Sequence, residues 1–219
     1  MYQPAHFVEN DPDTLLALMR GSPFATLVHC AGGELAAELL PLEVDRVDDT
    51  WRLTGHVARA NPLWKTAHAQ PVLAVFQGAQ AYVSPNWYPA KARHGKVVPT
   101  WNYTVVQAHG RLRAIEDRDW LHALVSRLTR HHEGGRDAPW HVTDAPSDYI
   151  ETMLGAIVGI EIEVTRLEGK FKLSQNRADE DRLGVVQGLA DDTEVGMQPL
   201  AAQMVRAMDE AEARRRSQP

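Results

Sequence analysis

The segment that decides the fold class is residues 24–57, FATLVHCAGGELAAELLPLEVDRVDDTWRLTGHV. It contains three strand-like runs, Phe24–Cys30, Glu34–Val44 and Thr50–Val57. The runs are separated by Gly32-Gly33 and Asp48-Asp49, dipeptides that form tight turns between antiparallel neighbours. The segment therefore predicts the start of a β-meander.

Strand-like patterns continue beyond this segment. A hairpin-like pair is expected at Pro71–Phe76 and Gln80–Val83. Thr100–Ile115 is long enough for one bent strand or for two pieces broken at Gly110. Apolar and polar residues alternate in Ile157–Leu167, which indicates a late, half-buried strand. Six or seven antiparallel strands predict a small barrel, not an alternating βαβ sheet.

Helices are expected only at the ends and corners of this barrel. The first has Pro12 near its start, and a short one after the meander has Asn61 as its cap and Pro62 as its first residue. Further helices are expected at 117–131, from about 146, at 179–189 and at 194–213. The fold class is therefore mainly β with added helices at the barrel ends and the C-terminus.

Length and composition limit the classes of protein that this chain can represent. With 219 residues and 44% hydrophobic content, it can bury one sizeable core, and we expect a single domain over residues 1–208 with a charged tail over 209–219. The formal charge of −6 gives no global positive field for nucleic acid. Cys30 is the only cysteine, and no export signal or long apolar run is present, so we expect a cytoplasmic protein without a membrane span.

The most informative motif is residues 54–65, TGHVARANPLWK, which joins a strand end, an arginine turn and a capped helix start. Free N–H groups at that helix start, with the charges of Arg59 and Lys65, are suited to hold a phosphate. An ordinary strand-to-helix turn with solvated cations is the alternative interpretation of the same residues.

Two later segments have the composition of a ligand site. Residues 81–91 and 98–103 are dense in aromatic, amide and hydroxyl side chains, which suit a planar ring but also anchor loops and dimer seams. Residues 169–177, GKFKLSQNR, bring basic and amide groups after a strand. They suit a phosphate or a flavin edge, or a solvated turn with a helix cap at Ser174 or Asn176.

Several common site types are absent from the sequence. The histidines are scattered singly apart from His131-His132, which cannot face one ion from a regular helix, so no metal site is expected. There is no P-loop, no dinucleotide-binding glycine motif and no nucleophile elbow. We find no helix-turn-helix pattern, so neither charge nor motif supports direct DNA binding.

Five motifs, in order, resemble those of the PaiB family of FMN-binding negative transcriptional regulators. They are Met1–Phe7, Gly55–Pro62, Val83–Tyr88, Pro99–Tyr103 and Lys170–Asn176. The resemblance spans residues 1 to about 208, and five ordered motifs are much more specific than any one of them.

This resemblance implies an FMN-binding split β-barrel related to pyridoxamine-phosphate oxidases. It further implies a homodimer with two equivalent sites at the subunit interface, each drawing on both chains. By the same resemblance the FMN phosphate is held by Arg59, Asn61 and Lys65. The flavin is expected to contact Leu40, Leu42, Thr54, Gly55, His56 and Trp101. The partner chain is expected to contribute Lys172, Ser174 and Gln175.

The function implied is that of a dimeric negative transcriptional regulator that senses flavin or redox state, with no catalytic residues. A flavin-dependent oxidoreductase or a haem-handling protein of the same barrel class is the alternative. A structural dimer that has lost its cofactor is a third hypothesis, which the basic and amide groups at Arg59 and at Lys172–Gln175 disfavour.

Overall fold

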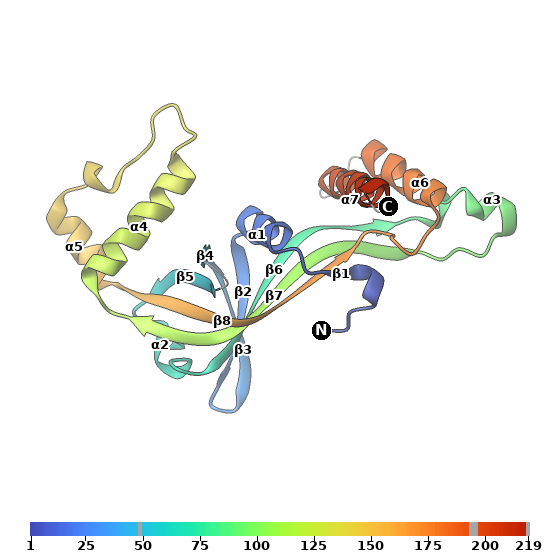
Figure 1. The fold of residues 1–219 in the computed structure, drawn as a ribbon. Coiled ribbons are helices and arrows are strands. Elements are labelled where there is room, and N and C mark those ends of the chain that lie inside the picture. The colour runs from blue at the N-terminus through green and yellow to red at the C-terminus, as the bar shows by residue number, and fades with distance from the viewer. Residues whose placement is uncertain (48–49, 193–196, 218–219) are drawn as a thin grey trace. The chain divides into compact units, whose positions relative to one another are not determined.

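The computed structural model describes residues 1–47, 50–192 and 197–217 (Figure 1). The described strands form one sheet in the order β3-β2-β6-β7-β8-β5-β4, with β1 paired to β8. They are β1 Val8–Glu9, β2 Phe24–Ala31, β3 Glu34–Pro41, β4 Glu43–Val47, β5 Thr50–Ala58, β6 Pro71–Val83, β7 Thr100–Ile115 and β8 Ile157–Lys172. The α-helices are α1 Pro12–Gly21, α2 Leu63–Thr66, α3 Ala90–His94, α4 Arg118–Glu133, α5 Ser147–Gly155, α6 Asp179–Asp191 and α7 Met197–Ser217.

The chain divides into two compact units, each built from separate stretches of sequence. The central unit comprises Met19–Phe76 and Gln107–Leu167. The terminal unit comprises Met1–Leu18, Gln77–Val106 and Glu168–Pro219. The long strands β6, β7 and β8 each contribute residues to both units. The single domain expected over residues 1–208 stays a prediction.

The meander predicted from residues 24–57 is present in the central unit, with one break. Gly32 and Gly33 form the β2–β3 turn with φ angles of 62° and 90°, which few other residues adopt. The prediction of one strand over Glu34–Val44 is wrong, because β3 ends at Pro41 and β4 begins at Glu43. Between them, the Leu42 N–H donates to the Pro23 carbonyl at 2.9 Å. β4 then pairs with β5 instead of β2. The expected turn Asp48-Asp49 lies outside the described residues.

Two other strand predictions differ from the structure. The expected hairpin around Gly78 is one continuous strand, β6. β7 is unbroken at Gly110, which is one of the two forms expected for Thr100–Ile115. A Cβ at residue 78 would lie 2.3 Å from Thr104 Oγ1, so this glycine permits close strand packing and marks no turn. β8 continues to Lys172, so the first part of the 169–177 block is strand and not the turn after one.

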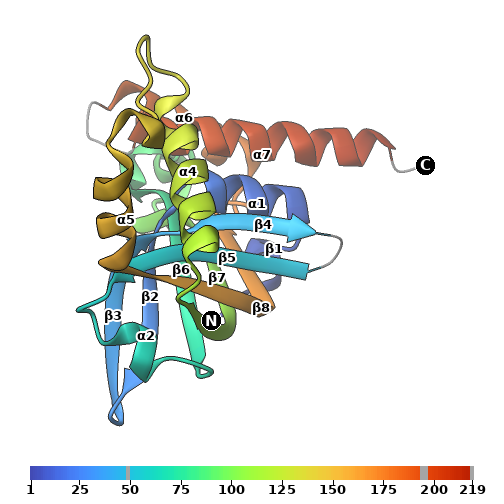
Figure 2. The ribbon, with the colours of Figure 1, turned by 90° about the vertical axis from the view of Figure 1, so that its left-hand side faces the viewer.

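Two helices pack beside the sheet within the central unit. α4 begins where predicted, because the Asp117 carboxylate caps it by accepting from the Trp120 N–H at 2.8 Å. α5 lies beside α4 (Figures 1 and 2), and Arg118 Nη1 donates to the Glu151 carbonyl at 2.7 Å. The two helices and the sheet give the mainly β architecture with added helices that the sequence predicts.

The terminal unit has its own apolar core under α6 and α7. Val83, Tyr88, Leu173, Leu189 and Met204 are among its buried members. α7 extends past the expected end at Ala213, so the described part of the expected 209–219 tail is helical; its expected start at Glu194 lies outside the described residues. No helix among the described residues is long and apolar enough to span a bilayer.

Candidate functional site

The side chain of Arg59 holds the end of β5 against the α5–β8 junction. Its Nε donates to the Gly155 carbonyl at 2.8 Å and its Nη2 to the Ile157 carbonyl at 3.2 Å. Nη1 forms an ion pair with Glu116 Oε2 at 2.6 Å. A guanidinium has five N–H donors, so these contacts leave two for an anion. Arg59 is therefore a structural clamp first, with limited capacity for a phosphate.

The turn after Arg59 is ordered by short-range bonds. Asn61 Oδ1 accepts from the Leu63 N–H at 2.8 Å, which is the capping contact expected from the sequence, although the helix begins at Leu63 instead of Pro62. Trp64 Nε1 donates to the Arg59 carbonyl at 3.0 Å. The ammonium of Lys65 is exposed, 4.8 Å from the centre of the Trp64 ring. Lys65 is thus the most accessible cation of the predicted phosphate group.

Four predicted flavin contacts form the wall of the barrel. Leu40, Leu42 and Thr54 are buried. A Cβ at Gly55 would lie 2.9 Å from the Pro41 carbonyl and 3.0 Å from Leu42 Cδ2. The end of β3 therefore crosses β5 at a point where only glycine leaves enough room, and this contact closes one side of the barrel.

His56 is the predicted contact with an unsatisfied polar atom. The ring is half-buried, and its Nδ1 is buried without a hydrogen-bond partner among the described residues. Burial lowers the pKa of His56 below its ordinary value of 6.5, because desolvation disfavours the imidazolium. The neutral ring is therefore favoured, and it can donate from one nitrogen and accept at the other. An unsatisfied buried nitrogen fits a site that a polar ligand completes.

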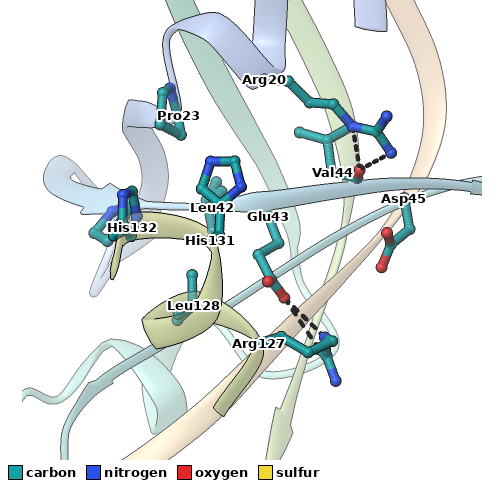
Figure 3. Close-up of a pocket in the computed structure, with 11 residues that line it drawn as sticks. Arg20, Pro23, Leu42, Glu43, Val44, Asp45, Arg127, Leu128, His131 and His132 are labelled. Carbon is teal, nitrogen blue, oxygen red and sulfur yellow. Dashed lines mark hydrogen bonds and ion pairs between the residues drawn. The ribbon is translucent and has the colours of Figure 1, made fainter. Parts of the chain in front are cut away.

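Leu42 also lines a pocket of about 320 Å³ between β4, the last turns of α4 and Arg20 (Figure 3). Arg127 donates twice to Glu43 Oε2, at 3.2 and 3.0 Å, and so joins α4 to β4. Arg20 donates to the Val44 carbonyl at 3.3 and 3.2 Å. The guanidinium groups of Arg127 and Arg20 are therefore both hydrogen-bonded within the protein. The other ionisable side chains that line the pocket are Asp45, His131 and His132.

The terminal unit contains the other four predicted site residues. Trp101 is exposed, and Lys172 Nζ donates to Thr100 Oγ1 at 2.6 Å and to the Trp101 carbonyl. Ser174 is buried with a φ of 62°, and its Oγ accepts from Asn102 Nδ2 at 2.9 Å. Gln175 bonds at both ends of its amide to the backbone, with the Leu173 N–H at 2.7 Å and the Phe171 carbonyl at 2.6 Å.

These contacts separate the four residues into two kinds. Ser174 and Gln175 use their polar atoms within the protein and shape the bend after β8. Trp101 and Lys172 present a ring and an ammonium. Burial, and then repulsion from Lys170 and Arg177, lowers the pKa of Lys172 below its ordinary value of 10.5.

Eight of the predicted residues thus belong to the central unit and four to the terminal unit. Sequence reasoning missed the pocket residues Glu43 and Arg127, because they lie 84 positions apart and neither belongs to a recognisable motif. It quoted Asn102 within a motif but assigned it no role. Among the described residues, no group of three or more His, Cys, Asp or Glu side chains could hold a metal ion.

The strand order, the closure at Gly55 and the peripheral helices define the class of this protein, which is a split β-barrel. The fold is shared with two solved structures. They are the flavocytochrome Anf3 from Azotobacter vinelandii (TM-score 0.56, 15% identity, 81% of this chain and 75% of that chain) and a FAD and heme binding protein from Mycobacterium smegmatis (TM-score 0.59, 18% identity, 80% and 78%).

The chain belongs to the family described as "Putative FMN-binding domain", whose profile matches residues 1–166. It is similar to the Bacillus subtilis "Protease synthase and sporulation protein PAI 2", with 33% identity over 96% of this chain and 97% of the relative. It is also 34% identical to an uncharacterised Aspergillus fumigatus protein over 87% of each chain. The resemblance drawn from the five motifs, the split-barrel fold and the flavin cofactor are therefore confirmed.

Proposed function

We propose that this protein is an FMN-binding homodimer that regulates transcription negatively, in response to its flavin or to redox state. Membership of an FMN-binding family and similarity to a relative named for protease synthesis and sporulation support this function. The buried Nδ1 of His56, which has no hydrogen-bond partner among the described residues, is the observation that carries the flavin site. A cytoplasmic location belongs to the same proposal.

In this proposal the residues present hold the cofactor as follows. Lys65 and the two remaining N–H groups of Arg59 bind the phosphate, with Asn61 ordering the turn between them. The neutral His56 ring hydrogen-bonds a polar edge of the flavin, while Leu40, Leu42, Thr54 and Gly55 provide the wall. Trp101, Lys172, Ser174 and Gln175 come from the partner chain, with the last two shaping the bend that presents Lys172. A bound flavin supplies reversible one- and two-electron chemistry.

The surface that supports a homodimer is the outer face of the β2–β3 hairpin. Phe24, Leu35 and Leu39 are each more than half exposed on it. In the register of the hairpin, Phe24 pairs with Pro41, Thr26 with Leu39 and Cys30 with Leu35. Paired residues, and residues two apart in a strand, point to the same face of the sheet, so the three apolar side chains lie on one face. A contiguous exposed apolar face of this kind is typical of a protein–protein interface.

The first experiment is the visible absorption spectrum of the purified protein, before and after incubation with FMN and desalting. A retained band at about 450 nm establishes the flavin site. His56→Ala is expected to weaken FMN binding by about 0.5–1.5 kcal/mol, the range for a neutral hydrogen bond. The matched control is His122→Ala, which removes an exposed imidazole from α4. A protein that stays colourless after loading contradicts the flavin site.

The regulatory part is tested separately with the FMN-loaded dimer. Binding to its own promoter DNA that weakens with rising salt and depends on sequence supports direct regulation. The net charge of −6 and the absence of a recognition motif favour regulation through a protein partner instead. If neither DNA nor a transcription protein is bound in either redox state, the regulator assignment is wrong.

A flavin-dependent oxidoreductase is the second candidate, and the pocket beside Leu42 is the observation that favours it. This pocket carries ionisable side chains and is large enough for a small substrate (Figure 3). Flavin-dependent oxidation of a reduced nicotinamide or of pyridoxamine phosphate, lost on Arg127→Ala, would support the enzyme. One structure that shares the fold is named a FAD and heme binding protein and another a flavocytochrome, so a Soret band after haem addition tests the haem-handling alternative.

A further inference from the structure

A pocket of about 460 Å³ lies within the terminal unit, between α1, the end of β8 and α7. Its walls come from residues 9–18, 171–175 and 203–210, which all belong to that unit. Of the predicted flavin contacts only Gln175 lines it, and both ends of the Gln175 amide are bonded to the backbone. The pocket is therefore a feature separate from the proposed flavin site, and its chemistry is set by other residues.

One part of the pocket wall is apolar. Leu18 and Leu173 are buried, while Phe171 and Ala207 are half-buried beside them on the same wall. Small-molecule pockets are typically lined in this way, by apolar side chains with a few polar groups among them. A ligand can therefore bury an apolar group here.

The α7 side of the pocket provides hydrogen-bond donors. Gln203 and Arg206 are three positions apart on the helix and so share one face. Gln203 Oε1 accepts from Thr104 Oγ1 at 3.3 Å, which leaves the amide N–H groups for a ligand. Arg206 has no hydrogen-bond or ion-pair partner among the described residues. A free guanidinium beside a free amide is suited to bind a carboxylate.

The α1 side of the pocket provides acceptors. Glu9 Oε1 accepts from the Asp11 N–H at 2.8 Å, and Glu9 Oε2 has no partner in the described part of the chain. The Thr14 hydroxyl donates to Asp11 Oδ1 at 2.8 Å, so its oxygen can only accept from a ligand. A carboxylate oxygen and a hydroxyl oxygen are suited to bind an ammonium group.

The charges of the wall disfavour a ligand with a single charge. Glu210 adds a second carboxylate, whose ion pair with Arg214 is long, at 3.8 Å. A simple carboxylic acid would pair with Arg206 but would also face Glu9 and Glu210. A simple amine would pair with Glu9 but would face the Arg206 guanidinium. A ligand that carries both charges is complementary to the whole wall.

We propose that this pocket binds an α-amino acid with a large apolar side chain. Arg206 and Gln203 bind its carboxylate. Glu9 and Thr14 bind its ammonium group, and its side chain packs against Leu173. None of these five residues is a predicted flavin contact, so the site adds a second small-molecule ligand to the proposed function.

The test is isothermal titration calorimetry on the flavin-free protein with L-phenylalanine and two analogues. Phenethylamine lacks the carboxylate, and hydrocinnamate lacks the ammonium group. We expect L-phenylalanine to bind at least about tenfold more tightly than either, because each analogue leaves one charged group of the wall unpaired. Glycine, which lacks the side chain, should also bind at least about tenfold more weakly. The proposal is overturned if L-phenylalanine does not bind, or if either analogue binds as tightly.

Two charge variants assign the contacts. Arg206→Gln should remove the preference over phenethylamine and keep the preference over hydrocinnamate, whereas Glu9→Gln should do the reverse. Lys96→Gln and Asp209→Asn change exposed charges of the same unit that do not line the pocket, and both should retain the two preferences. Unfolding midpoints verify that all four variants fold. If both preferences survive in Arg206→Gln and in Glu9→Gln, the proposal is wrong.

Nuclear magnetic resonance places the ligand in the fold. The methyl groups of Leu18 and Leu173 should shift when L-phenylalanine is added, because its ring lies against them. Leu124, which is buried in the central unit, should not shift. Shifts at Leu124 alone would overturn the proposal.

A titration in the presence of saturating FMN separates this site from the flavin site. L-phenylalanine should still bind to the FMN-loaded protein. Displacement of L-phenylalanine by FMN would make the pocket part of the flavin site and would overturn the proposal. A protein that binds L-phenylalanine but refuses FMN would contradict only the proposed flavin site.

Discussion

The guanidinium of Arg59 bonds to two carbonyls that lie 96 and 98 positions further along the chain. Arg59→Ala leaves both without these donors, and the loss is expected to lower the free energy of unfolding by about 1–3 kcal/mol. Denaturant unfolding measures it, with Lys65→Ala as the control at an exposed cation of the same turn. If the proposed phosphate contact holds, FMN affinity of the folded Arg59→Ala dimer also falls, by about 1.5–3 kcal/mol. Unchanged stability would contradict the clamp, and unchanged affinity the phosphate contact.

Gly55 is a position at which any side chain would obstruct closure of the barrel. A methyl group there meets the Pro41 carbonyl at 2.9 Å, and backbone cannot rotate away as a side chain can. We expect Gly55→Ala to destabilise the protein by about 1–3 kcal/mol through overpacking. Gly135→Ala is the matched control, because a Cβ there meets nothing within 4 Å and its effect should stay within about 0.5 kcal/mol. Equal unfolding midpoints for the two variants would show that β3 can shift away from β5.

His56 makes stability depend on pH. Because its pKa is lowered in the folded protein, the unfolded chain binds the proton more readily, so the stabilisation is fully present above about pH 6.5 and is lost as the pH falls below it. His56→Gln should therefore reduce the fall in unfolding midpoint between pH 7 and pH 5. Part of the pH dependence should remain in this variant, because burial also lowers the pKa of His109. A His56→Gln slope equal to that of the unaltered protein would contradict this role.

At the scale of elements, the proposed function predicts that the outer face of the β2–β3 hairpin forms the dimer interface. Leu39 is 65% exposed on its outer face, and Val98 is 63% exposed in the loop before β7. If the hairpin face forms the dimer, Leu39→Glu should shift the protein to a monomer at micromolar concentration, because a charge would be buried without a partner. Val98→Glu introduces the same charge at equal exposure and should leave the dimer intact. Analytical ultracentrifugation measures the oligomeric state of both variants. If Leu39→Glu remains a dimer, the interface lies elsewhere.

Element prediction was most accurate where local chemistry sets the backbone. The Gly32-Gly33 turn and the helix α4 are found where the sequence indicates them. It was least accurate for β6 and β8, where Gly78 was interpreted as a turn and Lys170–Lys172 as the start of one. Both errors have the same cause, because the length of these strands depends on pairing with neighbours that are distant in the sequence.

At the scale of the whole molecule, the proposed site couples flavin binding to dimer formation. If Trp101 and Lys172 contact a flavin held by the partner's central unit, the monomeric Leu39→Glu variant should bind FMN at least about tenfold more weakly, since dimer and ligand then stabilise each other. Fluorescence titration across a range of protein concentrations measures this coupling. An FMN affinity that is independent of concentration and of Leu39→Glu would mean that one chain forms the complete site.

The sequence by itself determined the β-rich class, the Gly32-Gly33 turn, the family and the flavin cofactor, because these depend on local spacing and on ordered motifs. Only the tertiary structure decided how each site residue is used. It places Ser174 in the core against Asn102 and commits three of the five N–H groups of Arg59 to Glu116 and to carbonyls of the α5–β8 junction. The physical reason is that hydrogen bonding, burial and charge pairing depend on side chains contributed by distant segments, which local patterns do not encode.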